Sequence, residues 1–141
     1  MLQKLEKQPD AVHRILVVED NPHTAYLLQF IMQRSGYEVI IAADGRDALA
    51  AIENLGPVDA AVIDLMLPYV SGYQLIQTIR ENVEWQNVPI IVLSGKVLEQ
   101  DIVKAFDYGA DDYVTKPFRP RELLARLKRC LTRSLVQAAS R

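Results

Sequence analysis

The feature of this sequence that most constrains its fold is a regular alternation of short apolar runs with longer amphipathic segments. Runs rich in Val and Ile favour strands that are buried on both faces of a sheet. We predict strands over Ile15–Val18, Val39–Ala42, Ala60–Ile63, Val88–Leu93 and Tyr113–Thr115. We predict helices over Asn21–Arg34, Arg46–Leu55, Gly72–Arg80, about Leu98–Tyr108, and from Pro120 onward.

Strands that alternate with helices form right-handed βαβ units, and such units build a parallel sheet. Gly36, Gly56-Pro57 and Gly109 stand where the predicted helices should end, as is common for glycine and proline. The sequence therefore predicts an α/β protein with helices on both faces of the sheet. In such folds ligands bind at the carboxyl ends of the strands.

Length and composition indicate one globular domain. The chain has 141 residues, half of them hydrophobic, and a formal net charge of −2, so no basic field favours nucleic acid or an anionic membrane. Cys130 is the only cysteine, which rules out an internal disulfide and suits a reducing, cytoplasmic setting. No apolar stretch is long enough to cross a bilayer. We expect a polar N-terminal arm over residues 1–13, the domain over 14–133, and a helical tail or truncated linker over 134–141.

Polar residues stand at the end of four of the five predicted strands. Glu19-Asp20 follows the first strand, Asp64 the third, Ser94 the fourth and Lys116 the fifth. Neighbouring carboxylates repel one another unless a cation lies between them, and Mg²⁺ is bound by carboxylates, water and phosphate oxygens. Together with one lysine and one hydroxyl, they predict a phosphoryl pocket in which Asp64 is the nucleophile.

Each of these residues taken alone has a simpler explanation. Asp64 could end a strand at a turn, Glu19-Asp20 could cap the following helix, and Lys116 could lie in an exposed loop. Ser94 alone indicates nothing. The placement of all of them on one edge of the sheet, in strand order, favours a shared site.

Four stretches, "ILVVEDNP", "AAVIDLMLPYVSG", "VPIIVLSG" and "GADDYVTKPF", resemble the motifs of response-regulator receiver domains, the CheY-like superfamily of two-component signalling. The resemblance extends from about Arg14 to Leu131. It implies the flavodoxin-like (βα)5 fold, a doubly wound parallel sheet with strand order 2-1-3-4-5. It also implies a phosphorylation-activated switch rather than an enzyme with its own substrate, found in the bacterial cytoplasm.

The resemblance assigns a role to each residue of the predicted pocket. Asp64 is expected to accept a phosphoryl group from a phosphohistidine on a sensor kinase or phosphotransfer protein, with Mg²⁺ required. Asp20 and Asp64 would bind the metal directly, Glu19 through water, and Met66 through its backbone carbonyl. Lys116 would pair with the phosphoryl oxygens.

The same resemblance describes the switch and its lifetime. Ser94 is expected to turn toward the phosphoryl group, and Tyr113 to swing into the vacated space. The Lys116–Pro117 bond is expected to be cis. Met66 and Lys96, two residues beyond Asp64 and Ser94, should flank the route of the hydrolytic water. A methionine orients water poorly, so we predict a phosphoryl state that lasts minutes rather than seconds.

The loop after the acceptor departs from the family pattern. Where receivers commonly have Pro-Gly-Met/Leu-Asp/Ser-Gly, this chain has Pro68-Tyr69-Val70-Ser71-Gly72, so a tyrosine replaces a glycine beside the site. We expect this tyrosine to narrow access without changing the chemistry. Gly95 follows the switch serine where a small residue, often alanine, is common.

Other functional classes account for fewer of these features. Phosphatases of the haloacid dehalogenase type need a second acid two residues after the nucleophile, but this chain has Met66 there and its aspartate follows the third strand. A flavin or nucleotide carrier would favour a glycine-rich phosphate loop, which the sequence lacks. A pseudo-receiver is disfavoured because every catalytic position is filled.

The end of the sequence resembles receivers that dimerise on phosphorylation through their fourth helix, fifth strand and fifth helix. Charged side chains there could form ion pairs between subunits or a solvated face, where each pair contributes about 0–1 kcal/mol. These residues are Lys104, Asp111, Asp112, Glu122 and Arg126. We expect no direct binding of nucleic acid by this segment and no contact with a membrane. Trp85, in a polar stretch, is predicted to be half-exposed.

Overall fold

The computed structural model describes residues 11–139, with side chains to Ser134, and contains every strand and helix that the sequence predicts. The strands are β1 (Arg14–Val18), β2 (Glu38–Ala42), β3 (Ala60–Ile63), β4 (Ile90–Ser94) and β5 (Asp112–Thr115). The helices are α1 (Pro22–Arg34), α2 (Gly45–Asn54), α3 (Gly72–Glu81), α4 (Glu99–Tyr108) and α5 (Pro120–Ala139). Strand β4 begins two residues later than predicted. Val88 instead ends the preceding turn, where its amide donates to the Trp85 carbonyl and its carbonyl accepts a hydrogen bond from Arg80.

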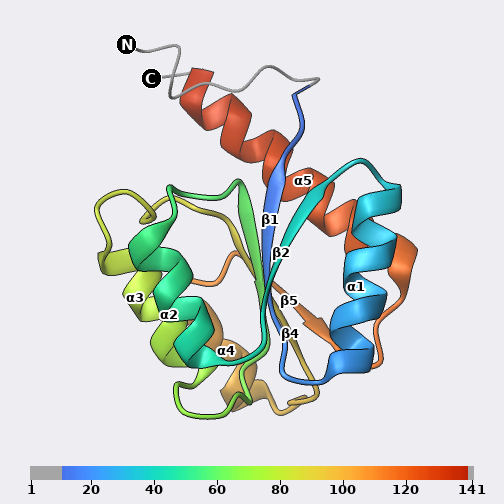
Figure 1. Cartoon of the computed structure of the whole chain (residues 1–141). Helices are drawn as coiled ribbons and strands as arrows, with labels where there is room; N and C mark the ends of the chain where they lie inside the picture. Colours follow the sequence, from blue (N-terminus) through green and yellow to red (C-terminus); the bar gives the residue numbers. More distant parts are fainter. Residues whose placement is uncertain (1–10, 140–141) are drawn as a thin grey trace.

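The strands form one parallel sheet in the order β2-β1-β3-β4-β5, which confirms the predicted flavodoxin-like topology. Helices α1 and α5 cover one face, and α2, α3 and α4 cover the other (Figure 1). The order reverses at β1, and the carboxyl ends of β1 and β3 therefore lie beside each other at the centre of one edge. This is the switch point at which α/β sheets bind ligands.

Each face of the sheet has its own apolar core. On one face, Leu28 and Met32 of α1 and Leu123 and Leu127 of α5 pack on the side chains that the central strands direct toward these helices. On the other face, α2 and α3 pack on alternate residues of the same strands, a cluster that includes Trp85. Burial on both faces explains why the central strands β3 and β4 are apolar up to their carboxyl ends.

Trp85 is fully buried, so the prediction that it would be half-exposed is wrong. The Asn82 side-chain oxygen accepts a hydrogen bond from the Trp85 amide at 3.1 Å, in the turn after α3. The indole N–H donates to the Leu55 carbonyl at 3.3 Å. The polar neighbours Glu84 and Gln86 are exposed and gave no sign of this inward turn.

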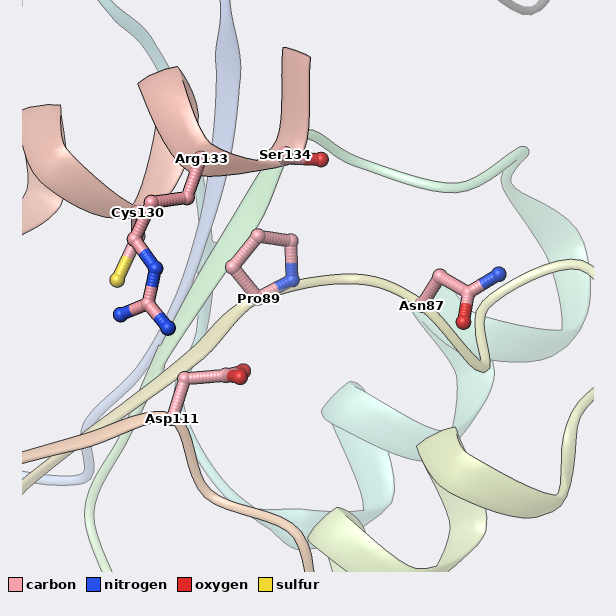
Figure 2. Close-up of a pocket in the computed structure, with 6 residues that line it drawn as sticks. All are labelled: Asn87, Pro89, Asp111, Cys130, Arg133 and Ser134. Carbon is pink, nitrogen blue, oxygen red and sulfur yellow. The ribbon is translucent and has the colours of Figure 1, made fainter. Parts of the chain in front are cut away.

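A shallow cavity of about 50 Å³ lies near the amino end of β4, beside α5 (Figure 2). It is lined by Asn87, Pro89, Asp111, Cys130, Arg133 and Ser134. The Asp111 carboxylate already accepts hydrogen bonds from Arg80 and from the Ile90 amide, both at 2.9 Å or less. Burial raises the pKa of the Cys130 thiol, which keeps it protonated. The cavity is therefore a packing feature rather than a second reactive centre.

The ends of the chain bear on the predicted domain limits. Most of the expected arm, residues 1–10, and residues 140–141 lie outside the described part of the chain. Helix α5 continues without a break from Pro120 to Ala139, across the expected boundary at residue 133, so the limits remain predictions. Within residues 11–139, every helix is too short or too polar to cross a membrane.

Candidate functional site

The sheet register brings the predicted site residues together. Val18 of β1 lies opposite Ile63 of β3, and the Asp64 amide donates to the Val18 carbonyl at 3.1 Å. Glu19 and Asp64 therefore leave neighbouring strands side by side. On the other flank Ser94 lies opposite Thr115, and the Lys116 amide donates to the Ser94 carbonyl at 2.9 Å.

Three carboxylates form a compact cluster at this edge. One oxygen from each of Glu19, Asp20 and Asp64 lies within 4.8 Å of the others. Glu19 and Asp64 are buried, at 2% and 6% relative exposure, whereas Asp20 is exposed at the mouth. Neither Glu19 nor Asp20 caps α1, because the Asn21 side-chain oxygen accepts from the first amides of that helix. The alternative reading of this acidic pair as a helix cap is therefore wrong.

Lys116 reaches across the cluster from the loop after β5. Its ammonium nitrogen Nζ lies 2.7 Å from Glu19 Oε1 and 2.9 Å from Asp64 Oδ2. The Lys116–Pro117 peptide bond is cis, as the resemblance implied. Both partners of the lysine are buried, so these are charge-assisted hydrogen bonds at the base of the site rather than surface ion pairs.

Burial and pairing act in opposite directions on these groups. Burial raises the pKa of Glu19, and the hydrogen bond from Lys116 only partly offsets it. Burial alone would lower the pKa of Lys116, but its hydrogen bonds to Glu19 and Asp64 raise it overall, so the lysine is charged at neutral pH. Three ionised carboxylates and one ammonium group sum to a charge of −2, which one divalent cation would neutralise.

Asp64 is held by the loop between β3 and α3. The Met66 amide donates to Asp64 Oδ1 at 3.1 Å, while Oδ2 receives the lysine. The Met66 side chain points into solvent, with 62% of its surface exposed. Gly72, the first residue of α3, lies against the Asp64 carbonyl, where a Cβ atom would collide with it. The acceptor therefore has a fixed backbone and a carboxylate with both oxygens engaged.

Ser94 and Tyr113 lie on the β5 side of the site. Ser94 is fully buried, and its hydroxyl oxygen accepts from the Lys96 amide at 3.2 Å. The Tyr113 hydroxyl donates to the Lys96 carbonyl at 2.7 Å, so the tyrosine contacts the loop that begins at the serine. Burial raises the pKa of the Tyr113 hydroxyl, which is consequently neutral and able to donate. The Lys96 side chain lies 3.7 Å from Asp101 of α4.

Tyr69, the residue that stands in place of a glycine beside the site, is 69% exposed, and its effect on access stays a prediction. Its ring lies beneath the guanidinium of Arg46, the second residue of α2, whose carbon Cζ is 3.5 Å from the ring centroid. No local pattern predicts this pair, because the two residues are far apart in the chain and the contact depends on how α2 and the loop meet.

The donor set suits a hard divalent ion. Carboxylate oxygens, one of them exposed to water, match the preference of Mg²⁺ for few protein ligands and retained waters. The described residues place no cysteine or histidine in this cluster, which disfavours softer metals. The residues that could hold the ion are Glu19, Asp20 and Asp64.

The structure thus combines a CheY-like α/β sheet with a buried aspartate at its switch point, which a lysine holds within an acidic cluster. The chain belongs to the response regulator receiver domain family, whose model matches residues 15–128. It is 44% identical over 127 residues to the alkaline phosphatase synthesis transcriptional regulatory protein PhoP of Bacillus subtilis, covering 90% of this chain and 52% of that protein. It is 40% identical to the DNA-binding response regulator MtrA of Mycolicibacterium smegmatis, covering 86% and 51%. The chain thus spans about half the length of these relatives.

Solved structures agree with this assignment. A CheY-like receiver domain from Methanospirillum hungatei matches with a TM-score of 0.84 and 31% identity, covering 90% of this chain and 99% of that one. The receiver domain of a Pseudomonas aeruginosa sensor histidine kinase matches with a TM-score of 0.79 and 34% identity, covering 86% and 99%. That structure has a magnesium ion coordinated in its active-site cleft.

Proposed function

We propose that this domain is a cytoplasmic switch that accepts a phosphoryl group on Asp64 from a phosphohistidine of a sensor kinase or phosphotransfer protein. An Asp64 carboxylate oxygen forms the new bond to phosphorus, and the bond from phosphorus to the histidine nitrogen breaks. The leaving imidazole takes up a proton. The observation that carries the proposal is the buried Asp64 carboxylate, whose two oxygens are oriented by Lys116 and the Met66 amide.

Charge neutralisation is the main task of the surrounding residues. A bound Mg²⁺ would supply a positive charge that lowers repulsion between the carboxylates and the incoming phosphoryl oxygens. Asp20, Asp64 and the Met66 carbonyl would bind it directly, and Glu19 would act through a water. Lys116 already spans Glu19 and Asp64, so its ammonium group is placed to move onto a phosphoryl oxygen.

The signal would leave the site through Ser94 and Tyr113. A phosphoryl group offers acceptor oxygens to the Ser94 hydroxyl, which now accepts from the Lys96 amide. Tyr113 contacts the carbonyl of that same residue, so a shift of the Ser94–Lys96 segment changes where the tyrosine ring rests. The surface formed by α4, β5 and α5 is thereby biased between two arrangements.

Dimerisation through that surface would require an exchange of ion pairs. Within the described chain Asp112 already pairs with Arg126 at 3.0 Å and with Arg129 at 3.1 Å. Asp111 pairs with Arg80, and Arg126 also approaches Glu122. We propose that a phosphorylation-dependent homodimer, if formed here, redistributes these contacts between subunits. The output is expected to act on a partner or downstream domain, without direct binding of nucleic acid by this segment.

The lifetime of the phosphoryl state would depend on Met66 and Lys96. The exposed Met66 side chain stands at the mouth of the site and offers no strong hydrogen bond to a water in line with the phosphorus. Lys96 is held toward Asp101 rather than toward the acceptor. Slow hydrolysis follows, and the domain remains a switch rather than a phosphatase.

Phosphorylation with a small donor tests the proposal directly. Incubated with MgCl₂ and acetyl phosphate, the protein should gain one phosphoryl group that is stable in acid and lost in base. Asp64→Asn should abolish labelling, whereas Asp59→Asn, which changes an aspartate before β3, should label normally. Circular dichroism verifies that both variants are folded. Equal labelling of Asp64→Asn would refute the assignment, and release of phosphate from an added phosphomonoester would indicate a phosphatase.

A further inference from the structure

The loop between β3 and α3 contains a tyrosine in a backbone conformation that tyrosine rarely adopts. Tyr69 has φ 71°, in the left-handed region. The Val70 amide donates to the Pro68 carbonyl at 2.8 Å, so Tyr69 is the central residue of a γ-turn with positive φ, the rarer and more strained of the two γ-turn forms. Such a conformation persists only where surrounding contacts hold it.

The contacts that hold this turn come from the start of α2. The Arg46 guanidinium lies over the Tyr69 ring, 3.5 Å from its centroid. Beside it, Gly45 packs so closely on Val70 that a Cβ on the glycine would lie 2.5 Å from the Val70 side chain and carbonyl. Two successive residues of α2, Gly45 and Arg46, therefore contact two successive residues of the loop, Val70 and Tyr69.

The loop that α2 contacts in this way is the one that follows the proposed acceptor, Asp64. It begins at Asp64 and is closed by the hydrogen bond from the Gly72 amide to the Leu65 carbonyl, at 3.0 Å. Met66 lies between those ends, with its amide on Asp64 Oδ1. Only Leu67 and Pro68 separate Tyr69 from Met66, so a rotation of the Tyr69 turn would reorient the Met66 peptide groups.

We propose that Arg46 and Tyr69 form a positioning clamp that sets the Met66 backbone for metal binding at Asp64. This inference rests on the proposed function, because it assigns the Met66 carbonyl to Mg²⁺. Neither side chain touches the metal or the phosphoryl group. The clamp replaces the flexibility of a glycine in this loop by a stacked and strained aromatic residue.

Calorimetric titration of the unphosphorylated protein with MgCl₂ tests the clamp. Arg46→Met removes the planar cation and leaves a shorter, unbranched apolar side chain. It should raise the Mg²⁺ dissociation constant about tenfold, the low end of the range for groups that orient metal ligands from outside the coordination sphere. Tyr69→Leu should have a similar effect, and the double variant should be no worse than either single one. Arg34→Met, which breaks another exposed contact of an arginine with an aromatic ring, 5.6 Å from the Phe30 centroid, is the matched control and should bind as the parent does.

Two further measurements separate the clamp from the metal assignment. Asp20→Asn should weaken Mg²⁺ binding far more than Glu19→Gln, and if the two variants bind Mg²⁺ as the parent does, the metal site is wrong, whatever Arg46 does. Hydrogen exchange of the Val70 and Gly72 amides tests the clamp without metal, and should become faster in Arg46→Met while the urea midpoint stays unchanged. Unchanged exchange, or single variants whose effects on the dissociation constant multiply in the double variant, would overturn the clamp.

Discussion

Lys116→Met should destabilise the protein, because the buried carboxylates of Glu19 and Asp64 lose their positively charged partner. The lysine makes two charge-assisted hydrogen bonds, of 2.7 Å to Glu19 and 2.9 Å to Asp64. Removing one partner of a buried pair typically costs about 3–5 kcal/mol. The lysine side chain here is 26% exposed and water can reach the mouth, so we expect a loss of about 2–3 kcal/mol.

The pH dependence of this loss identifies its cause. Burial raises the pKa of Glu19, and Lys116 holds that pKa down, so the variant should have a still higher Glu19 pKa. A carboxyl group with a raised folded-state pKa binds more protons in the folded state, so its penalty is full above that pKa and disappears as the pH falls toward 4.5. The deficit of Lys116→Met should therefore shrink from pH 8 toward pH 5.

Urea unfolding followed by circular dichroism, at pH 8 and pH 5 with chelator, measures both effects. Lys96→Met is the matched control, because Lys96 forms only a partly exposed pair with Asp101 at 3.7 Å and should lose less than about 1 kcal/mol. Added MgCl₂ should restore part of the stability of Lys116→Met by binding the folded state. A variant as stable as the parent at pH 8, or a deficit equal at both pH values, would refute the reasoning.

Three further predictions concern the same edge of the sheet. Asp20→Asn should weaken Mg²⁺ binding far more than Glu19→Gln in a calorimetric titration, because only Asp20 is proposed as a direct ligand, and it should raise the melting temperature in chelator by relieving repulsion. Gly72→Ala should cost about 1–3 kcal/mol in urea unfolding, because the new Cβ collides with the Asp64 carbonyl. Met66→Asn should speed dephosphorylation of the phosphoprotein in Mg²⁺, measured as the loss of radiolabel with time. An unchanged rate would remove Met66 from the hydrolysis mechanism.

Much of the fold follows from periodicity, because the central strands β1, β3 and β4 are buried on both faces and so appear as apolar runs. The site was predictable for a related reason. A polar residue at the end of such a run, as at Asp64 or Lys116, must lie at the carboxyl edge of a parallel sheet. Topology then brings these residues together without any information on side-chain contacts.

Other features depend on contacts that no local pattern records. Trp85 was misplaced because its inward position within a polar stretch is held by non-periodic contacts, its amide donating to the Asn82 side chain and its indole N–H to the Leu55 carbonyl. The sequence showed that Tyr69 stands in place of a glycine, but not that it would retain a glycine-like φ of 71°. The side chain that stacks on its ring, Arg46, comes from α2, far from Tyr69 in the sequence.

The buried position of Trp85 determines what the intrinsic fluorescence of this protein can report. It is the only tryptophan of the chain, and it lies in the loop before β4, at the opposite edge of the sheet from Asp64. Its emission maximum should lie at short wavelength, and it should move to longer wavelength only when α2 and α3 separate from the sheet and water reaches the indole. A ligand that merely enters the acidic cluster leaves that layer in place. Any change in emission on phosphorylation would therefore report a rearrangement that has crossed the full length of the strands.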